Sequence, residues 1–84
     1  MAYRLLISME VVEFVEQLPS RAKRRMREVI RSIGENPLGR SDAVDQDATG
    51  RRLEIAVVGD YALMYWIDEA HRQVKILDLH AADR

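Results

Sequence analysis

A series of short apolar runs in the last third of the chain constrains the fold more than any other feature. Residues 52–57 alternate apolar side chains with other side chains, which is the two-residue period of a β-strand. Two further strand-like runs follow at residues 61–68 and 74–79, separated from their neighbours by Gly59-Asp60 and by a second polar turn. Turns as short as these join antiparallel neighbours in a sheet. The sequence therefore predicts a three-stranded meander in this region.

Two segments upstream have the spacing of amphipathic helices. The apolar residues of the first are Val11, Phe14, Val15 and Leu18, and those of the second are Ala22, Met26, Val29, Ile30 and Ile33. Ser8 is expected to cap the first helix and Pro19 to end it, while Gly34 is expected to end the second in a left-handed conformation. Because the joint at Pro19 and Ser20 is short, the helices are predicted to form an antiparallel hairpin that presents both apolar stripes to a sheet.

Together these elements predict an α+β fold in one domain, residues 1–84. Residues 3–7 suit an N-terminal strand, and the two-helix hairpin is expected to pack on a mainly antiparallel sheet that ends in the meander. Residues 35–50 have no periodicity and are expected to form a surface connection with at most one helical turn. A chain of 84 residues buries only about 60–65% of its unfolded surface, so a second domain is not expected.

The composition limits the sites and compartments open to the chain. It has no cysteine, so neither a disulfide nor a thiolate metal site is possible, and only His71 and His80 could bind a metal through nitrogen. No metal or other cofactor is expected. The first eight residues hold one basic residue and an apolar run too short for a signal peptide or a membrane span. A soluble, cytoplasmic protein with no membrane partner is therefore predicted.

The charge is distributed unevenly along the chain. Residues 20–40 carry seven basic and two acidic side chains, whereas residues 41–84 carry five basic and nine acidic ones. A basic block of this kind attracts phosphates or an acidic partner, although it is equally typical of the solvated face of a helix. The candidate RNA-binding residues are Arg21, Arg24, Arg25 and Arg51.

The predicted sheet has a second apolar face. In residues 61–68 both alternating sets of side chains are apolar, so Ala62, Met64 and Trp66 would lie opposite the set that meets the helices. An exposed apolar patch usually marks the seat of a partner, and the alternative is a core that wraps around, with Trp66 covered by the connection before the meander. Arg52 is expected to lie across from Trp66 as a cation over the ring.

The order strand, helix, helix, connection and three strands resembles the RelE/ParE superfamily, the toxins of bacterial type II toxin–antitoxin pairs. The resemblance covers nearly the whole chain and rests on its size, its element order and the runs Val58 to Asp68 and Val74 to Leu79, with their hydrophobic-Gly-Asp-Tyr core. It implies a growth inhibitor that a cognate antitoxin neutralises, in a system of the kind that stabilises plasmids.

Members similar to RelE cut messenger RNA on the ribosome without a metal. This chemistry needs a base or positioner for the ribose 2′-hydroxyl, cations beside the phosphate and an acid for the leaving oxygen. The resemblance implies Arg52, His80 and Arg84 as candidate catalytic residues. Glu54 and Ala62 stand where the family carries basic residues, and a tyrosine usual near the C-terminus has no counterpart. The implied catalytic set is therefore depleted.

Three functions stay open on this evidence, and with them the question of whether the chain is an enzyme. The first is a ribosome-dependent messenger-RNA endonuclease that uses Arg52, His80 and Arg84. The second is a ParE-like inhibitor that binds DNA gyrase, and the third is a catalytically inert binding module. The apolar side chains at Ala62, Met64 and Trp66 favour protein binding, and the antitoxin is expected to cover them together with the basic helix.

Overall fold

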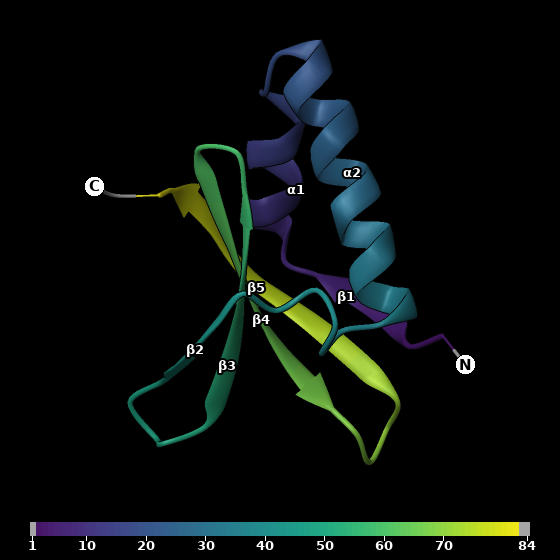
Figure 1. Cartoon of the computed structure of the whole chain (residues 1–84), viewed down its shortest axis with the longest axis vertical. Coiled ribbons are helices and arrows are strands. Elements are labelled where there is room, and N and C mark those ends of the chain that lie inside the picture. Colours follow the sequence, from purple (N-terminus) through teal and green to yellow (C-terminus); the bar gives the residue numbers. More distant parts are fainter. Residues whose placement is uncertain (1, 83–84) are drawn as a thin grey trace.

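A five-stranded mixed sheet forms one layer of the structure, a computed structural model that describes residues 2–82. Its strands are β1 (Arg4–Ile7), β2 (Ala43–Gln46), β3 (Arg52–Val58), β4 (Tyr61–Asp68) and β5 (Gln73–Ala81). Their order across the sheet is β1-β5-β4-β3-β2 (Figure 1). β1 runs parallel to β5, and every other neighbouring pair is antiparallel. The predicted α+β fold with an N-terminal strand is confirmed.

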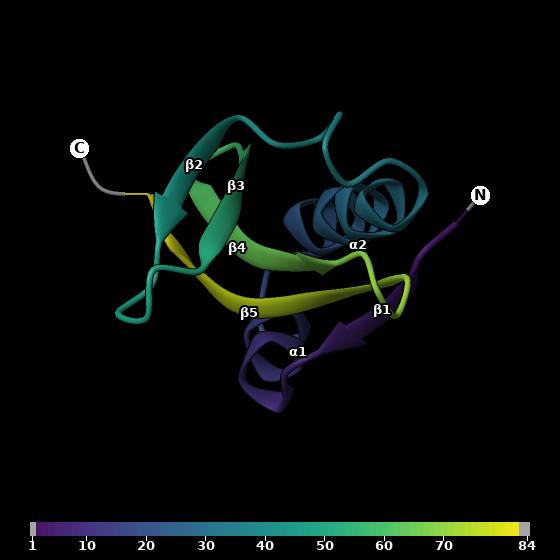
Figure 2. The same ribbon diagram turned by 90° about the horizontal axis from the view of Figure 1, so that it is seen from below.

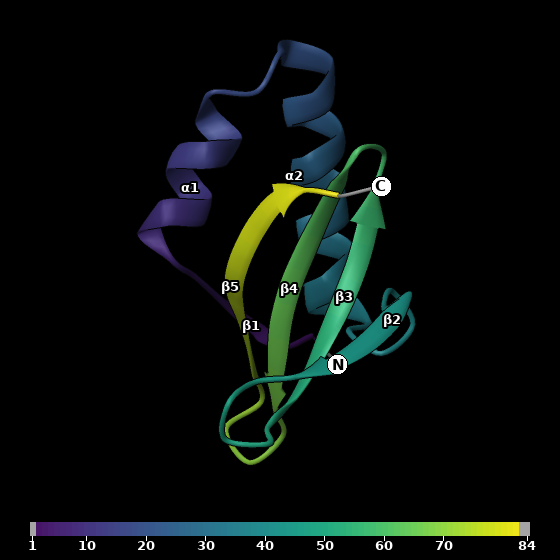
Figure 3. The same ribbon diagram turned by 90° about the vertical axis from the view of Figure 1, so that its left-hand side faces the viewer.

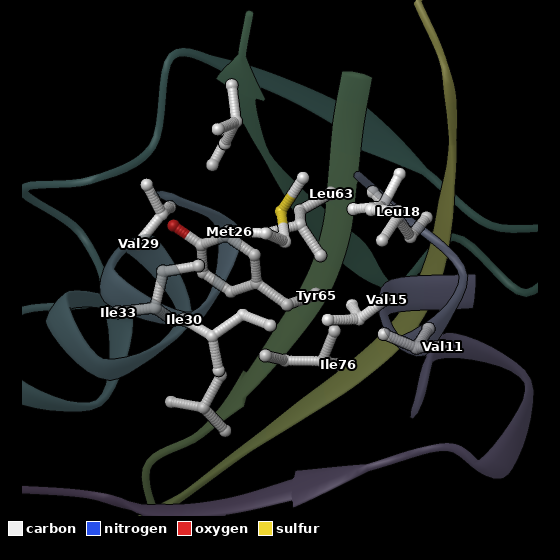
Figure 4. Packing of buried hydrophobic residues seen from close by; sticks show 14 residues of the cluster. Val11, Val15, Leu18, Met26, Val29, Ile30, Ile33, Leu63, Tyr65 and Ile76 are labelled. Carbon is white, nitrogen blue, oxygen red and sulfur yellow. The ribbon is translucent and has the colours of Figure 1, made fainter. Parts of the chain in front are cut away.

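Both helices cover one face of this sheet. In Figure 2, α1 (Met9–Glu16) lies next to β5 and α2 (Ser20–Glu35) lies next to β4. In Figure 3, the strands β3 and β4 lie in front of α2, and α1 lies beside β5. Buried side chains from both layers form one core (Figure 4): Val11, Val15, Leu18, Met26, Val29, Ile30, Ile33, Ala56, Val58, Leu63, Tyr65, Val74, Ile76 and Leu79. The predicted hairpin with both apolar stripes against the sheet is confirmed.

The predicted helix signals are correct at the start of α1 and wrong at the end of α2. The Ser8 hydroxyl oxygen accepts a hydrogen bond from the Val11 amide at 3.3 Å, as expected of a cap. Gly34 lies inside α2 instead of ending it. An added Cβ at Gly34 would lie 3.2 Å from the Leu5 side chain, and the Tyr3 amide donates to the Gly34 carbonyl at 2.8 Å. The glycine therefore lets the N-terminal segment approach the helix closely.

The connection predicted before the meander contains a strand. β2 pairs antiparallel with β3, with Ala43 opposite Ile55, and the Asp42 carboxylate beside it accepts a hydrogen bond from the Val57 amide at 2.7 Å. All four residues of β2 are exposed, so this edge strand needs no apolar alternation and leaves no signal in the sequence. The meander therefore has four strands, β2 to β5.

Side chains alternate between the two faces of the sheet along β3 and β4, and one set points away from the helices. Ala56 and Val58 of β3 and Leu63 and Tyr65 of β4 belong to the core, so their neighbours along each strand lie on the other face. We call this the open face. Its central residues are Leu53, Ile55 and Val57 from β3, Ala62, Met64 and Trp66 from β4, and Lys75, Asp78 and His80 from β5.

Candidate functional site

Trp66 is the centre of a cation cluster at one end of the open face. The Arg51 guanidinium carbon lies 4.1 Å from the centroid of the indole ring, and the Lys75 Nζ lies 4.6 Å from it. The expectation that Arg52 covers this ring is wrong, because the neighbouring residue Arg51 does so. Contacts of this kind contribute roughly 0.5–1 kcal/mol each at exposed sites. The cluster leaves Trp66 partly exposed and gives this end of the face a positive rim.

Arg52 points to the helix-covered side of the sheet, where it pairs with a buried carboxylate. Its Nε lies 2.6 Å from Oε2 of Glu54, and the Glu54 side chain is only 4% exposed. Glu54 shares this face with Ala56, because the two alternate along β3. Its second oxygen, Oε1, is buried and has no hydrogen-bond partner among residues 2–82. The charge of Arg52 is therefore balanced by a neighbour inside the protein.

The tyrosines of β4 are packing residues. Tyr65 is fully buried, and its hydroxyl donates to the Pro37 carbonyl at 2.6 Å. Burial, followed by the negative charge of Glu54, raises the pKa of Tyr65 to about 12. Tyr61 meets Phe14 edge to face, with ring centroids 5.8 Å apart. Tyr65 therefore fixes the segment that follows α2 onto the sheet.

His80 and Asp78 form a paired imidazole and carboxylate at the other end of the open face. The His80 Nδ1 lies 2.9 Å from Oδ2 of Asp78, and the imidazole side chain is 49% exposed. A carboxylate on one ring nitrogen sets the orientation and tautomer of a histidine. His80 lies directly opposite Ala62 on β4. The resemblance to the RelE/ParE superfamily implies an arginine at the position of Ala62.

The second histidine belongs to a separate cluster. His71 Nδ1 lies 3.0 Å from Oδ2 of Asp68, and Lys75 Nζ lies 3.9 Å from the same oxygen. Burial raises the pKa of Asp68, but the hydrogen bonds from His71 and the attraction of Lys75 outweigh it and hold the pKa below its ordinary value. Among residues 2–82, no three His, Asp or Glu side chains gather closely enough to hold a metal ion.

The structure does not bring Arg52 and His80 together. Arg52 begins β3, whereas His80 lies level with Val57, because both His80 and Val57 pair with Ala62. The offset from Arg52 to Val57 spans roughly 17 Å at about 3.3 Å per residue. The two side chains also lie on opposite faces of the sheet. Arg84, the third predicted catalytic residue, falls outside the described residues.

The predicted binding residues divide between the two sides of the molecule. Arg21, Arg24 and Arg25 are exposed on α2, on the helix side of the sheet, whereas Arg51 lies over Trp66 at the open face. The predicted partner seat over the open face and the basic helix is therefore not one continuous surface. Within that seat, Met64 and Trp66 are partly exposed, while Ala62 is only 9% exposed.

Two features of the site were missed by sequence reasoning. Lys75 joins Trp66 only through the pairing register of β4 and β5, which no local pattern reveals. Glu54 had a signal, because it is a single acidic residue in an otherwise apolar run. Its burial depends on the neighbouring elements and could not be read from that run.

The fold can be compared with those of solved structures. A chain in the crystal structure of the archaeal RelE–RelB complex from Pyrococcus horikoshii OT3 is 30% identical, with 100% of this chain and 99% of that chain covered and a TM-score of 0.85. The toxin–antitoxin complex RelBE2 from Mycobacterium tuberculosis matches at 22% identity, with 96% and 99% covered and a TM-score of 0.80. The isolated E. coli RelE toxin matches at 18% identity, with 99% and 87% covered and a TM-score of 0.76.

These similarities define the class of the protein as that of the toxin components of toxin–antitoxin systems. Within that class, the chain belongs to the RelE toxin family. No family model matches the chain, and no curated protein matches it. Neither helix in residues 2–82 has the length and apolar character that crossing a membrane requires.

Proposed function

We propose that the chain is a single-domain, cytoplasmic toxin that inhibits growth and is neutralised by a cognate antitoxin bound across the open face. The observation that carries this proposal is apolar surface on a sheet face that neither helix covers, with Val57 49% exposed beside Ile55 and Met64. Surface of this kind is typical of a protein-binding site. Matched structures from Pyrococcus horikoshii and Mycobacterium tuberculosis are described as a RelE–RelB complex and a toxin–antitoxin complex.

We further propose that inhibition depends on binding more than on RNA cleavage. Phosphoryl transfer needs cations beside the reacting phosphate, and one such group is typically worth about 3–4 kcal/mol of barrier lowering. His80 faces the small side chain of Ala62 across the strands, and Arg52 is balanced by Glu54 on the far side of the sheet. The nearest open-face cation along β5 is Lys75. It pairs with Trp66, four residues along β4 from Ala62, which is roughly 13 Å at about 3.3 Å per residue.

A second candidate function is ribosome-dependent cleavage of messenger RNA, with His80 as the general acid or base. The observation in its favour is the His80–Asp78 pair at 2.9 Å on the open face, because a carboxylate-oriented imidazole is a common proton-transfer group. In this alternative Arg84 would supply charge from the C-terminus and Arg52 would act only after leaving Glu54. Binding to DNA gyrase, the third possibility, would break DNA instead of halting translation.

Expression of the chain alone and together with its adjacent gene tests the proposal. We expect growth arrest from the chain alone, relief by the neighbouring product and co-purification of the two proteins. Radiolabelled amino-acid uptake and a DNA-break assay then separate arrest at the ribosome from arrest at gyrase. Mapping of messenger-RNA ends on translating ribosomes should show little or no cutting. Robust cutting that His80→Gln abolishes would establish the second candidate function instead.

Two exposed valines provide a matched test of the docking face. Val57 is 49% exposed on the open face, and Val44 is 52% exposed on the other side of the sheet, where it pairs with Glu54. We expect Val57→Glu to weaken capture of the neighbouring gene product and Val44→Glu to leave it unchanged. Equal capture by both variants, each folded by circular dichroism, would refute the assignment of this face.

A further inference from the structure

A pocket of about 260 Å³ opens beside the buried pair of Arg52 and Glu54. Its lining residues are Leu38, Arg52, Glu54, Trp66, Ile67 and Glu69. Glu54 is buried, Trp66 and Ile67 are partly exposed, and Leu38 and Glu69 are exposed. The lining therefore combines one buried carboxylate with the apolar side chains of Leu38 and Ile67.

The acidic group of this pocket is incompletely satisfied. Oε2 of Glu54 accepts a hydrogen bond from Arg52 Nε at 2.6 Å, while Oε1 is buried without a hydrogen-bond partner in the described part of the chain. A buried carboxylate oxygen in this state is costly, because it has lost its water and gained no donor. The terminal torsion of a glutamate side chain is broad, so the carboxylate can rotate to present Oε1 to the pocket, and the exposed Arg52 side chain can follow Oε2.

The other charges of the pocket are paired with neighbouring side chains. Glu69 at the mouth adds a second carboxylate, which also accepts a hydrogen bond from the Tyr3 hydroxyl at 2.9 Å and lies 3.5 Å from Arg72. The lining contributes one cation, Arg52, which is already committed to Glu54. Glu54, whose Oε1 lacks a donor, is therefore the anchoring group, because Glu69 is already paired with Arg72.

We propose that this pocket binds a lysine side chain of the partner protein. The aliphatic stem would lie along the side chains of Leu38 and Ile67, as such stems do on apolar surfaces, and the ammonium would donate to Glu54 Oε1. Lysine fits better than arginine, because the guanidinium fork is matched to both oxygens of a carboxylate and Arg52 already holds one of them. The identity of the partner as an antitoxin rests on the proposed function, whereas the chemistry of the pocket does not.

Small probes test the pocket without the partner. The ¹⁵N-labelled protein is titrated with N-acetyl-lysine N-methylamide and, as a neutral control of the same stem length, N-acetyl-norleucine N-methylamide. The backbone amides of Glu54 and Ile67, two lining residues of the pocket, report occupancy by chemical-shift change. We expect the lysine probe to bind at least about tenfold more tightly, since a hydrogen bond to a charged group typically contributes at least that factor and the norleucine probe has no donor. Equal affinity of the two probes, or no binding of the lysine probe, would overturn the proposal.

Three variants assign the effect to particular carboxylates. Glu54→Gln removes the buried charge and should abolish the preference for the lysine probe, whereas Glu69→Gln should lower affinity only slightly. Arg52→Gln should tighten binding, because Glu54 then loses its internal partner. The last two substitutions are at exposed residues, so they keep the proposal testable if Glu54→Gln does not fold. Unchanged or weaker binding by Arg52→Gln would contradict the proposal, and failure of the co-expression test would instead contradict the proposed function.

Discussion

Replacement of Tyr65 by phenylalanine should destabilise the fold through one hydrogen bond. The hydroxyl of Tyr65 donates to the Pro37 carbonyl at 2.6 Å, and the bond links residues 28 apart in sequence. Phenylalanine keeps the buried ring, so the packing of the core is preserved and the main loss is the donor. A buried carbonyl left without its donor costs about 1–3 kcal/mol. Because Pro37 is also buried, water cannot readily replace the hydroxyl.

Urea denaturation followed by far-ultraviolet circular dichroism measures this loss. For a domain of this size, 1 kcal/mol corresponds to a shift of about 4–8 °C in Tm, so thermal melting should show it as well. The control is Tyr61→Phe, since Tyr61 is partly exposed and packs on Phe14 through its ring. We expect that variant to stay within about 0.5 kcal/mol of the parent. Equal stabilities of the two variants would show that the bond to Pro37 contributes nothing.

Two further predictions concern alkaline pH and the β3–β4 turn. The folded pKa of Tyr65 is about 12 against an ordinary value of 10.0, so the contribution of Tyr65 to stability should be fully present below pH 10 and be lost between about pH 10 and 12. Urea midpoints measured between pH 9 and 12 should show this fall, and Tyr65→Phe should reduce it. Gly59 has φ of +59°, a conformation that costs other residues about 1–2 kcal/mol; Gly59→Ala should lower the free energy of unfolding by that amount, and an unchanged urea midpoint would contradict this reasoning.

The sequence predicts the core elements well, because burial imposes a period on them. The helices at residues 11–33 and the strands at 52–79 alternate as their packing requires. β2 was not predicted, because all its residues are exposed and burial therefore imposes no alternation of apolar and polar residues on it. Gly34 was misread because the same residue type serves a left-handed cap and a close approach, and only the position of Leu5 separates the two roles.

The candidate site was predicted less well, because it depends on register. Adjacent residues of a strand face opposite sides of a sheet, so Arg51 and Arg52 have different surroundings although they are neighbours in the chain. The sequence correctly predicts that the side chains on both faces of β4 are apolar. It does not predict the contact between Lys75 and Trp66, which depends on the pairing of β4 with β5. Nor could it show that His80 and Arg52 lie at opposite ends of the sheet, since that follows from the direction of β3 and β5.

The pairing of β1 with β5 has a consequence for synthesis of the protein. Arg4 pairs with Gln73 and Ile7 pairs with Ile76. β1 therefore has no neighbouring strand until β5 has been synthesised. Closing so long a loop is entropically unfavourable until the other strands have assembled. The nascent chain therefore cannot complete its sheet until β5 has been synthesised and has left the ribosome.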